Sequence, residues 1–117
     1  MELTINEKIY NFVFGYNFIR ELNKKYSVSE QGMKINTGLD NVLINFFNED
    51  VETLVEILKV SNATENPRVS EKGIIEYISE NGSEPLFDLV LEELKKSEFT
   101  KSKTNKVRQR IESNQNQ

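Results

Sequence analysis

The most regular pattern in the chain lies near its middle. Residues 38–58 read GLDNVLINFFNEDVETLVEIL. The first half carries apolar residues at spacings of three and four, which is the period of one face of a helix. These residues are Leu39, Val42, Leu43, Phe46 and Phe47. The pattern predicts a helix with a broad apolar face that must be buried against other elements.

A second helix is predicted directly after the first. The side chain of Asp50 can accept hydrogen bonds from the free amides of a new first turn. The apolar stripe then continues at Val51, Leu54, Val55 and Leu58. Because only residues 48–50 separate the two helices, we expect them to pack against each other as a hairpin.

The beginning of the chain alternates apolar and polar residues, as a half-buried β-strand does. Leu3 and Ile5 form one alternating series, and Tyr10, Phe12 and Phe14 form another after a polar turn. The pattern predicts a β-hairpin with one aromatic face. An isolated hairpin is only marginally stable in water, so this face should pack on the helices that follow. We therefore interpret the aromatic residues as core rather than as a binding site.

Three more helices are predicted from helical spacing, over residues 16–26, over a segment that follows Ser70, and over residues 85–96. Ser70 has the side chain of an N-cap, and Pro85 suits a first helical turn. Residues 27–38 hold two glycines and no sustained period, which predicts a loop with at most a short extended piece. The sum is an α+β, predominantly α-helical fold, in which an N-terminal β-hairpin packs on about five helices.

Charge is distributed unevenly along the 117 residues. Residues 95–117 carry seven basic and two acidic side chains, a net charge of +5, which leaves −9 for residues 1–94. A chain of this length is typical of one domain. The composition therefore predicts a single globular domain over residues 1–99, followed by a basic polar tail over residues 100–117 that is disordered.

Several classes of chemistry lack their usual residues. The chain has no cysteine and no histidine, which removes disulfides, thiol nucleophiles and the commonest general base. The five glycines are scattered and match no phosphate-binding loop. We therefore expect no catalytic residues, no cofactor, no metal and no enzymatic activity. With no apolar run long enough to cross a bilayer, we expect no membrane partner and a cytoplasmic location.

The basic tail leaves one alternative open. Clustered Lys and Arg between residues 101 and 110 can neutralise nucleic-acid phosphates. The acidic body would repel the same polyanion, so a solvated or partner-contacting tail is favoured. The alternative hypothesis is a small nucleic-acid-associated regulatory protein that uses this tail.

Four segments together resemble one known family. They read ELTINEKIYNFVFGYNFIRELNKKY, GLDNVLINFFNEDVETLVEIL, ENPRVSEKGIIEYI and LFDLVLEELKKS, and lie between residues 2 and 97. In order and pattern they resemble the tail assembly chaperones of phages and prophages of Gram-positive bacteria. One departure lies in the first turn, where that family usually has glycine and this chain has Glu7.

The resemblance implies a function without catalysis. It implies a protein that binds the tape measure protein, keeps it soluble and helps recruit tail tube protein subunits during tail morphogenesis. It also implies self-association, location in the cytoplasm of the bacterial host and absence from the mature virion. It implies no nucleotide and no cofactor.

Aromatic residues supply the candidate partner-binding site. We expect some of Tyr16, Phe46 and Phe47 to lie in a groove that meets a client helix or a second copy of the chain. The competing interpretation is that they are ordinary core residues. Alanine at these positions would distinguish the two, because core residues would lose folding and association together.

Overall fold

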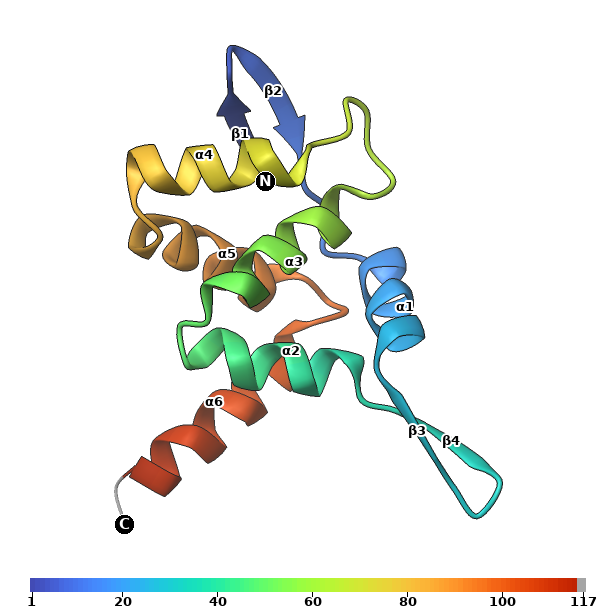
Figure 1. Cartoon of the computed structure of the whole chain (residues 1–117). Coiled ribbons are helices and arrows are strands. Elements are labelled where there is room, and N and C mark those ends of the chain that lie inside the picture. Colours follow the sequence, from blue (N-terminus) through green and yellow to red (C-terminus); the bar gives the residue numbers. More distant parts are fainter. Residues whose placement is uncertain (116–117) are drawn as a thin grey trace.

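The computed structural model describes residues 1–115, which form two β-hairpins and six helices (Figure 1). The α+β, predominantly helical fold class is confirmed, with six helices in the described residues instead of about five. The elements are β1 (Glu2–Ile5), β2 (Lys8–Asn11), α1 (Tyr16–Lys25), β3 (Ser27–Glu30), β4 (Met33–Asn36), α2 (Gly38–Phe47), α3 (Val51–Asn62), α4 (Glu71–Asn81), α5 (Glu84–Lys96) and α6 (Lys101–Gln115).

The predicted helical hairpin of α2 and α3 is confirmed, and it lies at the centre of the fold (Figure 1). Asp50 caps α3 by accepting hydrogen bonds from the backbone N–H of Thr53 at 3.2 Å and from its hydroxyl at 2.6 Å. The apolar faces of both helices are buried and form most of the core. Their most deeply buried members are Val42, Leu43, Phe46, Leu54, Ile57 and Leu58.

The N-terminal hairpin is also confirmed, and it packs on α4. β1 and β2 are antiparallel, with Leu3 opposite Tyr10. The apolar face is buried at Leu3, Ile5, Phe12 and Phe14, which are all at most 5% exposed. These side chains are therefore core residues, as the alternating pattern indicated.

The remaining predicted helices begin and end where their capping residues allow. The hydroxyl of Ser70 accepts a hydrogen bond from the N–H of Gly73 at 3.0 Å and so caps α4. Pro85 lies in the first turn of α5, where a missing N–H costs nothing. In the last turn of α5, Lys95 and Lys96 face the negative end of the helix dipole.

The disordered tail is a wrong prediction for most of its length. Residues 101–115 form α6, which packs against α2 and α5. Thr104 and Val107 are buried on its inner face, and Thr100 donates its hydroxyl hydrogen to the carbonyl of Leu94 at 2.6 Å. Thr104 and Val107, with the partly buried Ile111, are enough to anchor a helix whose other faces are charged. Residues 116 and 117 of the predicted tail lie outside the described residues.

The loop predicted over residues 27–38 is instead a second β-hairpin. β3 and β4 are antiparallel, with Val28 opposite Ile35, and a two-residue turn at Gln31 and Gly32 joins them. Both turn residues have positive φ, at 51° and 77°. All eight strand residues are exposed, and the hairpin extends away from the helices (Figure 1). Its backbone forms a regular ladder although its side chains contribute nothing to the core.

Candidate functional site

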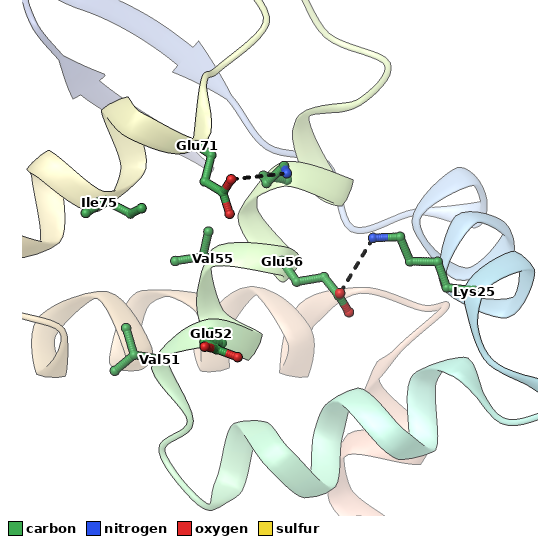
Figure 2. A pocket seen from close by; sticks show the side chains of 8 residues that line it. Lys25, Val51, Glu52, Val55, Glu56, Glu71 and Ile75 are labelled. Carbon is green, nitrogen blue, oxygen red and sulfur yellow. Dashed lines mark ion pairs between the residues drawn. The ribbon is translucent and has the colours of Figure 1, made fainter.

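A groove lies between α3 and α4 on the described surface. Its apolar part is made by Val51 and Val55 on α3 and by Ile75 on α4, and Figure 2 shows these side chains around one hollow. Val51 is 42% exposed and Ile75 is 50% exposed, whereas Val55 is buried. The volume is 440 Å³, inside the range of about 300–1,000 Å³ that is typical of ligand sites.

Local sequence explains why these residues share the groove. Val51 and Val55 are four residues apart on α3, and Glu71 and Ile75 are four apart on α4, so each pair lies on one face of its helix. The caps at the beginning of both helices fix where these faces start. The two rows meet because α3 and α4 pack against each other.

The connection between α3 and α4 is held by one buried amide. The side-chain amide of Asn62 donates to the carbonyls of Asn11, at 2.9 Å, and Pro67, at 3.2 Å. Its oxygen accepts from the N–H of Val69 at 2.7 Å. Asn62 has no exposed surface, and these bonds satisfy backbone groups that would otherwise lack partners.

Charged side chains rim the groove. Lys25 pairs with Glu56 at 3.5 Å (Figure 2), and Lys59 pairs with Glu71 at 3.9 Å. Glu52 also lines the groove and makes no ion pair within residues 1–115. With three glutamates and two lysines, the rim has an excess of one negative charge.

One rim residue also holds the base of the second hairpin. The hydroxyl of Tyr26, which directly precedes β3, donates to both carboxylate oxygens of Glu56, at 3.0 and 3.1 Å. This hydrogen bond, followed by burial and the negative charge of Glu56, raises the pKa of Tyr26 above its usual value of 10.0. The orientation of the hairpin base is therefore linked to a side chain of the groove.

Of the three sequence-predicted partner residues, Phe46 and Phe47 lie together and Tyr16 lies apart from them. Phe46 is 3% exposed, and its ring lies 5.5 Å from that of Phe47 and 5.4 Å from that of Phe87. Tyr16 lies elsewhere, at the start of α1, and is 60% exposed. Of the three, Tyr16 therefore offers the most surface to a partner, and Phe46 belongs to the core.

Tyr16 instead pairs with a residue that the sequence did not single out. Its ring lies edge to face with that of Phe99, at 6.4 Å between centroids, and Phe99 is 56% exposed. The guanidinium of Arg20 stacks over the Tyr16 ring at 5.8 Å. We call Val13, Tyr16 and Phe99 the aromatic patch, because Val13 and Phe99 line one shallow hollow beside Gly15.

The basic helix α6 offers little free charge to a polyanion. Lys101 pairs with Glu98 at 2.8 Å, Lys103 pairs with Asp40 at 3.1 Å, and Arg108 pairs with Glu112 at 3.2 Å. Within the described residues this leaves Lys106 and Arg110 as the unpaired cations of the helix. The hypothesis of a nucleic-acid-associated regulator therefore loses most of its support.

Residues 1–115 offer neither a metal site nor a membrane-spanning helix. No three acidic side chains in this part gather as a metal site would require. No helix described here is long and apolar enough to span a bilayer. What the surface does offer is an apolar groove with a charged rim and an exposed aromatic patch.

These features belong to a mainly helical protein with an apolar groove and an exposed aromatic patch. A family model described as "Phage tail assembly chaperone protein, TAC" matches residues 2–109. The chain belongs to this family of phage tail assembly chaperones, which confirms the resemblance seen in its sequence. It is accordingly a chaperone and not an enzyme. No curated protein and no solved structure matches the chain.

Proposed function

We propose that the chain binds the tape measure protein during tail assembly and keeps it soluble by covering apolar stripes of its helices. The α3–α4 groove is the observation that carries this proposal. A client helix presents apolar side chains at spacings of three, four and seven residues, which is the mode in which helices bind to grooves. Val51, Val55 and Ile75 supply the apolar surface for such a stripe.

The rim indicates the charge of the client segment. Glu52 is unpaired within the described chain, and the rim is acidic by one charge. A client helix with lysine or arginine beside its apolar stripe would be attracted, and one with flanking acids would be repelled. We therefore expect the bound segments to be basic amphipathic helices.

A second contact is proposed at the aromatic patch. Tyr16 remains our candidate partner-binding residue, now together with Phe99, because both expose more than half of their surface. Exposed aromatic side chains contribute large contact areas at little cost in side-chain entropy. We propose that this patch helps recruit tail tube protein subunits while the groove holds the client. These steps would take place in the cytoplasm of the bacterial host, and the chaperone would be absent from the mature virion.

Co-expression with the tape measure protein of the same phage tests the proposal. A soluble complex should elute as one species in size-exclusion chromatography with light scattering. Val51→Asp and Ile75→Asp should each abolish it, because they place a charge on the apolar surface of the groove. Leu89→Asp is the matched control, since Leu89 is 47% exposed but lies on α5 outside the groove.

The outcomes separate binding from folding. All three variants should keep the helical circular dichroism of the parent, because all three side chains are already exposed. An aggregated tape measure protein beside free parent chaperone would refute client binding. A complex that survives both groove variants would leave client binding standing and remove the groove as its site.

A further inference from the structure

The β3–β4 hairpin, residues 27–36, has an apolar face without a partner. Val28, Met33 and Ile35 lie on that face and are 48%, 68% and 43% exposed. Each strand has a neighbour on one side only, so both outer edges keep free backbone groups. Three or more strands, or packing on a helix, are needed to make such a ribbon stable. Any surface that covers this face would have to come from outside residues 1–115.

The backbone pattern shows which residues point outward from β3. Thr37 donates its N–H to the carbonyl of Tyr26 at 3.1 Å, and the pairs Val28–Ile35 and Glu30–Met33 continue the same register. Since hydrogen-bonding direction alternates along a strand, the amides and carbonyls of residues 26, 28 and 30 face β4. Those of Ser27 and Ser29 therefore face away, at the free edge.

The two free edges differ in how well they are protected. Lys34 lies on β4, and an edge lysine is a usual means of preventing strands from pairing. β3 reads Ser-Val-Ser-Glu and carries no lysine, proline or bulge. The edge of β3 is therefore the one open to another strand.

We propose that two copies of the chain pair through their β3 edges, antiparallel, with Val28 of one copy opposite Val28 of the other. Ser27 of each copy then lies opposite Ser29 of the other, so the outward amides and carbonyls of both strands meet. Val28 forms the close, non-hydrogen-bonded pair on the axis, where side chains pack best.

The charges flanking β3 complement each other in this arrangement. Lys24 and Lys25 precede the strand, and Glu30 ends it. Within the chain Lys24 also pairs with Glu21 at 3.0 Å and Lys25 with Glu56 at 3.5 Å, and the side chains of both lysines keep more than half of their surface exposed. Antiparallel pairing brings Glu30 of each copy to the start of the strand of the other copy, beside its lysines. Glu30 makes no ion pair within residues 1–115, and its attraction to these lysines occurs twice because of the two-fold symmetry.

The product is a four-stranded sheet whose apolar row runs Ile35, Val28, Val28, Ile35 across the two copies. The base of the β3–β4 hairpin is already fixed, since the hydroxyl of Tyr26 donates to Glu56 and Gly38 packs directly on the backbone of Leu22. A two-fold contact closes after two copies, so any larger assembly would need a further interface elsewhere. The pairing does not depend on client binding.

Light scattering of the full-length chain alone, over a series of concentrations, tests the pairing. The parent should reach twice the 13.6 kDa mass of one chain. Val28→Lys should give a single-chain mass throughout, because it places two lysines opposite each other on the axis. Ser29→Pro should do the same, because it removes an outward N–H without breaking a bond to β4.

Two further variants make the result specific. Met33→Lys is the matched control, since it adds the same charge to the same face near the hairpin tip, and it should still pair. Glu30→Lys should weaken pairing about tenfold, because it turns two attractive contacts into repulsive ones, and adding Lys24→Glu should restore part of the loss without disturbing the Lys25–Glu56 pair of the groove. A parent that stays at 13.6 kDa at every concentration, or an oligomer that Val28→Lys leaves unchanged, would overturn the proposal.

Discussion

The two β-hairpins of the chain have almost the same backbone and opposite surroundings. Each has two four-residue strands joined by a two-residue turn with positive φ at both positions. Leu3 and Ile5 in β1 are at most 5% exposed because α4 covers them, whereas Val28 and Ile35 are more than 40% exposed. Alternation of apolar and polar residues therefore specifies a hairpin, but other elements decide whether its apolar face becomes core or interface.

The largest expected difference in stability is found when an isoleucine of each hairpin is replaced by alanine. Ile5→Ala should lower the free energy of unfolding by about 2–5 kcal/mol, because it removes buried methyl groups and leaves a cavity. Ile35→Ala should change it by less than about 0.5 kcal/mol, since its side chain is exposed. Urea unfolding at concentrations where the chain is monomeric would measure both values. Equal losses would show that the second hairpin belongs to the same cooperative core.

Sequence reasoning was most successful where one face of an element had to be buried. The apolar spacing after Leu39, the caps at Asp50 and Ser70, and the alternation at Leu3 and Ile5 all led to elements that exist. Such patterns are reliable because burial demands them along the whole element. The same reasoning identified Phe12 and Phe14 correctly as core.

The two wrong predictions, a disordered tail in place of α6 and a loop in place of the β3–β4 hairpin, have a common physical origin. In α6 the apolar contact with the core comes from Thr104, Val107 and Ile111, and a helix so polar has the composition of a disordered tail. In the second hairpin, Gln31 and Gly32 form the turn, and short alternating apolar residues lie on both sides of it. These apolar residues are not buried in the core, so the alternation is too short and too irregular to predict strands. Elements with little buried surface leave little trace in the sequence.

The candidate site shows the same limit. Phe46 and Tyr16 both occupy helical positions that fit an apolar face, yet one is buried and the other is exposed. Only tertiary packing separates them. The groove was missed because Val51 and Ile75 lie on different helices, and their partial exposure depends on how α3 and α4 meet.

A smaller effect should follow from the anchor of the first hairpin. Asn62→Ala would remove the hydrogen bond to the carbonyl of Asn11 at the end of β2 and leave buried backbone groups unpaired. We expect a loss of about 2–3 kcal/mol, because each orphaned buried group costs about 1–3 kcal/mol and the site relaxes in part. Chemical denaturation would measure it. Asn45→Ala is a suitable control, since Asn45 is exposed on α2, and an equal loss there would contradict a specific role for the buried amide.

The anchor of the second hairpin should matter less and should depend on pH. Tyr26→Phe would remove the hydrogen bond to the mostly buried Glu56, with an expected loss of about 1 kcal/mol. The pKa of Tyr26 is raised in the folded state, so its contribution is fully present below pH 10.0 and is lost as pH rises through the folded value. Between pH 8 and 11 the melting temperature of the parent should therefore fall more steeply than that of the variant. Parallel curves would show that the bond does not stabilise the fold.

The smallest expected effect compares the two turns directly. Glu7 and Gln31 both adopt positive φ, at 68° and 51°, a region that is costly for side chains other than glycine and asparagine. Glu7→Gly should raise the free energy of unfolding by about 0.5–1 kcal/mol, since relief of that strain exceeds the entropy lost by glycine. Gln31→Gly relieves similar strain in a hairpin that packs on no helix, so the melting temperature should stay unchanged while amide exchange within residues 27–36 slows. If Gln31→Gly raised the melting temperature as much as Glu7→Gly does, the β3–β4 hairpin would unfold together with the core. The free edge of β3 would then belong to the cooperative domain and would be a poorer candidate for pairing with a second chain.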